Sequence, residues 1–385
     1  MFNGFVTLNW IIGGCLAVII YLVYYNTQAT SIAAFQASRL TPSTFLIKEY
    51  DDIYSEHPHI YAKIIPSANT ILVIDTGCGG ASNNAKVKVK SLRQFIESFK
   101  IDDNDGLPLN DRGAMDYVVV LTHCHYDHIC TCISRYYVGI LTIFTSGGWG
   151  LVSHSTHIAE HSHLYDNSTD SPILASGHSP SFIDKAVLPE HSLCNALGIQ
   201  TPQYSPTLVP HQYAITSSTI DKIPLGVSIL HTPGHTPDEV ALYDEAEMML
   251  YVGDSLYEYE PIIFPREGSI VTWFSSVDYL ISFVEKKNAA LPTSTRNSST
   301  PMEVLINSGH RTTLRPALEV LVGARAFMED VVTGREKAKR RGWGRGEEIV
   351  IYEQAGDRFS LRCPERLIQE ARGEISDHAS ISHKL

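Results

Sequence analysis

The chain lacks several features that would place it in familiar protein classes. Its seven cysteines are odd in number, widely spread and without a Cys-x-x-Cys pair, which argues against a disulfide scaffold or a structural zinc knuckle. Thirty Lys and Arg residues stand against 42 Asp and Glu residues, and the net charge of −12 argues against a nucleic-acid binder, which needs basic surface to replace phosphate counterions. No collagen-like glycine period occurs, and the apolar fraction of 44% is enough for a packed core. The length of 385 residues fits two to three domains and fits one large α/β domain with appendages equally well.

Charged side chains are absent from the first 38 residues, where an apolar run extends from Trp10 to Tyr25. This run is near the lower length limit of a membrane-spanning helix, can be extended to Phe5, and has aromatic residues at both ends. We expect a single-pass N-terminal anchor within residues 5–25 and a membrane location. A cleaved signal peptide, an untranslated extension, and a cytoplasmic or secreted location are the alternatives.

The rest of the sequence contains short β-like runs separated by turn residues and helical patterns. The predicted strands are Phe45–Tyr50, Ile60–Ile65, Thr70–Ile74, Asp116–Leu121, Gly226–His231, Glu239–Tyr243, Met248–Val252 and Val304–Asn307. The predicted helices are Val87–Lys100, Ile270–Val284, Pro316–Val331 and Pro364–Arg372. Residues 147–222 lack periodicity and are expected to be a functional insertion or lid with short helices. The basic stretch 335–346 is expected to be a solvated connector.

The strongest chemical signal is the segment from Thr122 to His128, directly after a predicted buried strand. It contains His123, His125, Asp127 and His128, so that three imidazoles and a carboxylate lie within six positions. His123 and His125 alternate on extended backbone and can point the same way. Zinc accepts both donor types, and four such groups this close suit two adjacent ions better than one.

Three further candidate ligands follow other predicted strands. His235 lies in Thr232-Pro-Gly-His-Thr, Asp254 in Gly-Asp-Ser, and His310 in Ser-Gly-His. A fourth strand end carries Asp75, in Asp-Thr-Gly. A lone His or Asp at a strand end is usually structural, but the repetition of this placement predicts a shared metal site.

These motifs resemble the metallo-β-lactamase superfamily, which includes glyoxalase II and bacterial lactonases, over about Phe45 to Thr313. The resemblance implies a four-layer αβ/βα sandwich with two zinc ions per chain at one edge. It implies that the first ion is held by His123, His125 and His235, and the second by Asp127, His128 and His310, with Asp254 bridging them. It also implies that Asp75 orients the ligand loop by hydrogen bonding, and that Asp127 receives and returns a proton.

The resemblance divides the chain into an N-terminal hydrophobic segment and linker (1–42), a metallo-β-lactamase-like catalytic domain (43–325) and a C-terminal extension (326–385). Two departures stand out. Residues 129–132 (ICTC) occupy the place where many relatives have Gly-Gly, which predicts a narrower entrance, and the interval from His128 to His235 is long. The histidines of the insertion match no family ligand, and His231 is interpreted as structural.

The sequence therefore predicts a zinc-dependent hydrolase that uses a metal-bound hydroxide on a small acyl substrate, such as a lactone, a thioester or a related ester or amide. Selectivity is expected from the insertion and from Tyr257, Tyr259 and Phe264. A phosphodiesterase or nuclease, a β-lactamase proper, and a non-hydrolytic metal-binding member of the fold are the alternatives. A flavodiiron-like oxidoreductase would need a flavin domain, for which the C-terminal tail is too short.

Overall fold

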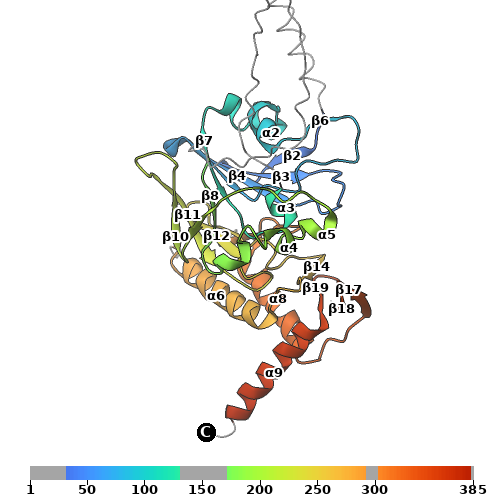
Figure 1. Cartoon of the computed structure of the whole chain (residues 1–385). Helices are drawn as coiled ribbons and strands as arrows, with labels where there is room; N and C mark the ends of the chain where they lie inside the picture. The colour runs from blue at the N-terminus through green and yellow to red at the C-terminus, as the bar shows by residue number, and fades with distance from the viewer. Residues whose placement is uncertain (1–31, 131–170, 292–301, 383–385) are drawn as a thin grey trace, which may run out of the picture.

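The computed structural model describes residues 32–130, 171–291 and 302–382 (Figure 1). Two large sheets dominate this part of the chain. The first has the strand order β2-β3-β4-β5-β7-β8-β9 and the second has the order β10-β11-β12-β13-β15-β16. The strands of the first sheet are Phe35–Arg39 (β2), Thr44–Glu49 (β3), His59–Ile65 (β4), Thr70–Ile74 (β5), Asp116–Val120 (β7), Ile173–Ser176 (β8) and Thr207–Val209 (β9). Those of the second are Tyr213–Thr216 (β10), Pro224–His231 (β11), Val240–Asp244 (β12), Met249–Tyr251 (β13), Leu305–Asn307 (β15) and Arg315–Pro316 (β16).

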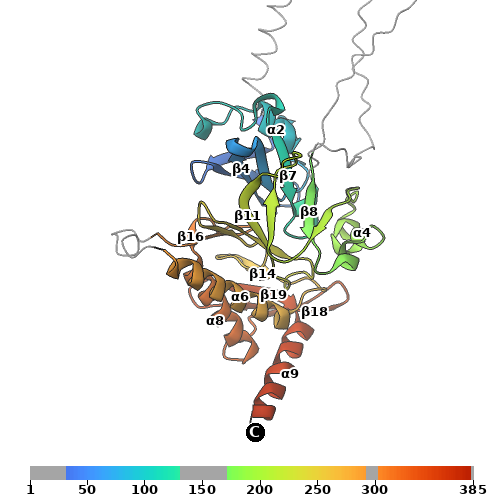
Figure 2. The ribbon, with the colours of Figure 1, turned by 90° about the vertical axis from the view of Figure 1, so that its left-hand side faces the viewer.

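The two sheets face each other across an apolar layer. Leu72 and Val118 from the first sheet and Leu242 and Met249 from the second belong to this central cluster, where each is almost wholly buried. Such burial supplies the main favourable free energy of folding because it removes apolar surface from water. Helices cover the outer faces, so the layers alternate as αβ/βα and the expected fold class is confirmed (Figures 1 and 2).

The covering helices differ in size between the two faces. The first sheet packs against α2 (Leu92–Ser98), whose Phe95 is fully buried. The second sheet packs against α6 (Ile270–Ala289) and α8 (Ala317–Val332). Short helices lie on the connections: α3 (Tyr126–Ile129), α4 (Leu188–His191), α5 (Cys194–Leu197), and the 3₁₀ turns Pro66–Ala68, Asp102–Asn104, Asp111–Gly113 and Pro180–Ile183. A two-stranded parallel pair joins β1 (Ile32–Ala33) to β6 (Val87–Val89).

Parallel neighbours inside each sheet determine where the site can form. Strand β5 pairs in parallel with β7, and β13 pairs in parallel with β15. The residues that follow the carboxyl ends of paired parallel strands therefore emerge side by side at one edge. The turns after β5 and β7 carry Asp75 and the histidine motif, whereas the turns after β13 and β15 carry Asp254 and His310.

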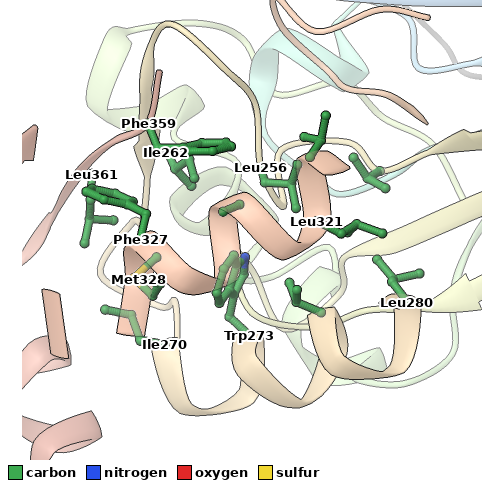
Figure 3. Close-up of a cluster of buried hydrophobic side chains, with 14 of the residues drawn as sticks. Leu256, Ile262, Ile270, Trp273, Leu280, Leu321, Phe327, Met328, Phe359 and Leu361 are labelled. Carbon is green, nitrogen blue, oxygen red and sulfur yellow. The ribbon is translucent and has the colours of Figure 1, made fainter. Parts of the chain in front are cut away.

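The C-terminal extension is a folded part of the second half of the molecule. A four-stranded sheet has the order β14-β19-β18-β17, from Pro261–Ile263 (β14), Ser360–Pro364 (β19), Glu347–Glu353 (β18) and Arg340–Gly344 (β17). Helix α9 (Glu365–Ser382) follows it. In Figure 3, Phe327 of α8 lies beside Phe359 and Leu361 of the extension, and the two phenyl rings are stacked with centroids 6.3 Å apart. These contacts join the extension to the core around α6 and α8.

Four local expectations need correction. The predicted helix 87–100 begins only at Leu92, since Ser91 caps it and Val87–Val89 forms β6. The described part of the 147–222 stretch is not a separate insertion, because it supplies β8 and β9 to the first sheet and β10 to the second. The basic stretch 335–346 is not a bare connector, because it contains β17, which pairs with β18. Strands also begin before residue 43, with β2 inside the segment assigned as linker.

The membrane assignment is corrected as well. In the ranges that the structure describes, no helix combines the length and the apolar character needed to cross a membrane. The predicted anchor at residues 5–25 lies outside those ranges, as do the insertion residues 147–170.

Candidate metal centre

The structure brings all seven predicted metal ligands together in two buried groups. The first consists of His123, His125 and His235, and the second consists of Asp127, His128, Asp254 and His310. Within each group, the donor atoms lie within 4.8 Å of one another.

Five elements converge to build these groups. The turn after β7 carries His123 and His125, and helix α3, which begins immediately afterwards, carries Asp127 and His128. The other three ligands follow β11, β13 and β15 of the second sheet. The site therefore lies where the edges of the two sheets meet, and each sheet supplies part of both groups.

The ring nitrogens of the first group lie at hydrogen-bond distance but cannot all be paired by hydrogen bonds. Nδ1 of His125 lies 3.0 Å from Nε2 of His123 and 3.0 Å from Nε2 of His235. One proton can serve only one of these two contacts. Three imidazole nitrogens directed at one point form the donor set of a divalent cation such as zinc.

The electrostatics of the first group favour the neutral, metal-binding form of its imidazoles. Burial and the charges of the neighbouring imidazoles lower the pKa of His123 well below its usual range. The same causes, burial first and His235 second, lower the pKa of His125 to about 3. Burial also lowers the pKa of His235. Each imidazole is consequently neutral at pH 7, and one of its two ring nitrogens has a lone pair available to a metal ion.

The second group pairs two carboxylates with two imidazoles. Oδ2 of Asp127 lies 3.2 Å from Nε2 of His310 and 3.4 Å from Nε2 of His128. Asp254 approaches the same two nitrogens through Oδ1 and Oδ2, at 3.5 Å from His128 and 3.6 Å from His310. Nε2 of His128 and Oδ1 of Asp254 are buried without a hydrogen-bond partner. Buried ligand atoms that lie close together without hydrogen-bond partners are expected where a cation binds between them.

The carboxylates and imidazoles of the second group shift each other's pKa in opposite directions. Burial alone would raise the pKa of Asp127, but the adjacent His128 holds it well below its usual range. Burial alone would lower the pKa of His128, but Asp127 and Asp254 hold it well above its usual range. A metal ion would take the place of the imidazole protons as the counter-charge to these carboxylates.

Hydrogen bonds to the remaining ring nitrogens fix the orientation of the ligands. Nδ1 of His128 lies 2.8 Å from Oδ2 of Asp75, which is the role predicted for this buried aspartate. Nδ1 of His235 lies 2.6 Å from the carbonyl of Ile263, and Nδ1 of His310 lies 2.9 Å from that of Glu56. Because these acceptors require a proton on Nδ1, they leave Nε2 as the metal-facing nitrogen.

Glu239 is a positioning residue that the sequence reasoning missed. Its buried carboxylate accepts the backbone N–H of Asp254 at 3.0 Å through Oε1, while Oε2 lies 3.6 Å from Nδ1 of His123. It therefore touches one ligand from each group. The only sequence signal was a pair of acidic residues, Asp238 and Glu239, immediately before the buried strand β12.

Gly309 allows the turn bearing His310 to approach the other ligands. A Cβ atom at this position would lie 2.2 Å from Oδ1 of Asp254 and 2.8 Å from Cε1 of His128. Any larger residue would push the ligands apart, so the close approach requires glycine.

Other candidates lie away from the two groups. Nε2 of His231 lies 3.0 Å from the carbonyl of Val209, as expected for a structural histidine. His178 and His191, from the stretch assigned as an insertion, belong to neither group. Cys130 packs with Cys78 and Cys194, and Cys132 lies outside the described residues.

A cavity of about 310 Å³ opens onto the metal-ligand groups. His125, Asp127, His235, Asp254 and His310 line its floor. The predicted selectivity residues Tyr257 and Phe264 line the wall, whereas Tyr259 is 64% exposed and lies outside the lining.

No protein-family profile matches the chain. A curated protein of Aspergillus versicolor, named "Putative transcription factor avaE", is 28% identical over 355 residues, which cover 90% of this chain and 91% of that protein. A metallo-β-lactamase family protein of Thermus thermophilus is similar in structure over 77% of this chain and 82% of that one, with 14% identity and a TM-score of 0.46.

Two further solved structures differ in their metals. The metallo-β-lactamase FIM-1 of Pseudomonas aeruginosa, in a mono-zinc form, matches 77% of this chain and 99% of its own at 10% identity, with a TM-score of 0.42. TTHA1623, in a di-iron-bound form, matches 69% of this chain and 93% of its own at 18% identity, with a TM-score of 0.36. The two facing sheets with their covering helices confirm the predicted αβ/βα sandwich, and the seven predicted ligands lie together in two groups.

Proposed function

We propose that the chain is a metal-dependent hydrolase that binds two zinc ions and cleaves a small acyl substrate, such as a lactone or a thioester. The observation that carries this proposal is the convergence of seven buried donors in two groups, five of which line one cavity. Neutral imidazoles and carboxylates are donors that zinc accepts.

The proposal assigns one ion to each group. His123, His125 and His235 would hold the first, and Asp127, His128 and His310 would hold the second, with Asp254 bridging the two. When bound, zinc would polarise an acyl carbonyl and lower the pKa of water to near 7.

The remaining steps belong to side chains of this protein. Asp75 keeps the ring of His128 oriented through the hydrogen bond described above, and Glu239 holds the backbone N–H of Asp254. Asp127 lines the cavity, and its Oδ2 atom lies between the Nε2 atoms of His128 and His310. This placement lets the Asp127 carboxylate accept a proton from the attacking water and return it to the leaving group. The rings of Tyr257 and Phe264 line the cavity, where they limit the access of water and shape the pocket for the substrate.

Two competing functions have weaker support. The name of the Aspergillus versicolor relative suggests a role in transcription, and a nuclease would also act on nucleic acid. Both need basic surface, whereas this chain has a net charge of −12. Salt-sensitive DNA binding by the full chain would favour them.

The test uses the full chain, stripped with a chelator and reloaded separately with Zn²⁺, Fe²⁺ or Mn²⁺. We expect about two ions per chain by metal analysis, and hydrolysis of lactones or thioesters in preference to β-lactams and phosphodiesters. The Asp127→Asn variant should lose about 100-fold or more in kcat. Asp116→Asn, a control at the opposite end of β7, should retain activity. Preference for a phosphodiester, or no acyl hydrolysis by the metal-loaded protein, would refute the proposal.

A further inference from the structure

The C-terminal sheet forms one wall of the cavity that contains the metal ligands. Arg345, at the turn between β17 and β18, and Arg362, on β19, line the cavity together with Arg266, which follows β14. These segments lie outside the two sheets of the sandwich. The extension therefore contributes directly to the substrate site.

These three arginines differ from the other described arginines in their partners. Elsewhere in the described ranges, each arginine side chain is paired with a carboxylate or hydrogen-bonded to the backbone or an amide; these are Arg39, Arg93, Arg112, Arg311, Arg315, Arg325, Arg335, Arg340, Arg341, Arg358, Arg366 and Arg372. No ion pair or side-chain hydrogen bond is found in the described structure for the guanidinium groups of Arg266, Arg345 and Arg362. All three are exposed, so a bound molecule can reach them.

The carboxylates of the same cavity already have partners. Glu347 pairs with Arg366 at 3.1 Å, and Glu260 pairs with Arg311. Glu56 accepts the hydroxyl of Tyr126 at 2.5 Å. The three arginines are consequently left as unpaired positive charge among the residues that line the cavity. Guanidinium groups bind carboxylate and phosphate through paired hydrogen bonds, and a cleft concentrates their field.

We propose that Arg266, Arg345 and Arg362, which line the same cavity as the metal ligands, form an anion subsite that binds a carboxylate or phosphate group of the acyl substrate. This inference rests on the proposed hydrolase function and narrows its substrates to those that carry a carboxylate or phosphate group. It also explains why an acidic chain retains a cluster of unpaired arginines at its cavity.

The experiment compares two probes that share one thioester and differ in whether the other end is a carboxylate or its methyl ester: the phenyl monothioester of glutaric acid and the same thioester of its monomethyl ester, with thiophenol release in the absence of protein subtracted from each rate. With the zinc-loaded full chain, we expect a KM for the carboxylate probe about tenfold lower than for the neutral probe, at similar kcat. The variant Arg345→Gln/Arg362→Gln should remove this preference and leave the neutral probe within about twofold of its original KM. Arg340→Gln, which removes a paired arginine of the same sheet, should change neither value.

A binding measurement separates failure of the subsite from failure of the proposed function. Calorimetry with the monoanilide of glutaric acid needs no turnover, and the double variant should bind it about tenfold more weakly than the original protein. Inorganic phosphate, added as a competitor, reports whether the site also accepts phosphate. Equal KM values for the two probes, or unchanged anilide binding in the double variant, would overturn the subsite. Absence of turnover with arginine-dependent anilide binding would overturn only the hydrolase function.

Discussion

Replacing Asp75 by Asn should weaken binding of the second metal ion, although the residue is not one of the proposed ligands. Oδ1 of Asp75 accepts the backbone N–H of Thr122 at 2.7 Å. Oδ2 accepts the hydroxyl of Thr122 and lies 2.8 Å from Nδ1 of His128. The carboxylate therefore acts only as an acceptor, whereas an amide must present one NH₂ group. Asn tolerates the left-handed backbone found at Asp75, where φ is 61°, so the turn itself should survive.

Either orientation of the amide is unfavourable. If the NH₂ group takes the place of Oδ2, the ring of His128 must accept at Nδ1, and its proton moves to Nε2. That nitrogen faces Asp127 and Asp254, so the proton would block the metal. If the NH₂ group takes the place of Oδ1, it meets the N–H of Thr122, and a buried donor loses its partner at a cost of about 1–3 kcal/mol.

We expect the affinity for the second ion to fall by about 10- to 100-fold, which corresponds to about 1.4–2.7 kcal/mol. Competition with a metal chelator, monitored by metal analysis, measures this change. Asp244→Asn is the matched control, because Asp244 is buried and accepts backbone N–H groups in the second sheet, at the end of β12. It should lower the free energy of unfolding without changing metal affinity. If the Asp75→Asn protein bound both ions with unchanged affinity, the proposed control of the His128 tautomer would be wrong.

Three further predictions concern separate parts of the site and fold. His235→Ala should lower the metal content by about half because it removes a donor of the first group, whereas His231→Ala should retain both ions; elemental analysis distinguishes them. Glu239→Gln should weaken metal binding by about tenfold, as measured by chelator competition, because its carboxylate touches a ligand of each group. Burial raises the pKa of Glu49 from 4.5 to about 8, so the folded protein keeps a proton that the unfolded chain releases above about pH 4.5. The free energy of unfolding should therefore fall as pH rises from about 4.5 to 8 and then level off, and Glu49→Gln should remove this contribution, which is at most about 5 kcal/mol, in urea titrations.

Clear outcomes would contradict each of these expectations. Equal metal loss in the His231 and His235 variants would mean that the two histidines are not distinguished by their placement. Unchanged affinity after Glu239→Gln would limit that residue to a packing role. A pH dependence of stability that is identical with and without Glu49 would show that this carboxyl does not retain its proton in the folded protein.

Local sequence signals predicted much of the sandwich because its central strands carry their own pattern. The runs Thr70–Ile74 and Asp116–Leu121 are almost wholly apolar, and the structure places them as adjacent parallel strands. The short strands β8 and β9 escaped prediction, since they have little periodicity and owe their conformation to pairing with a neighbour. The same reason explains β17, whose basic sequence becomes a strand through its pairing with β18.

The sequence alone determined which residue types could bind metal and that each follows a strand. Only the tertiary structure decided which of them meet, because ligand groups are assembled from turns of both sheets that are far apart in the chain. It alone showed that Glu239 touches a ligand of each group, and that arginines from a C-terminal sheet enter the cavity. Strand patterns and ligand motifs are local properties, whereas the contacts between turns depend on how the sheets pair and pack.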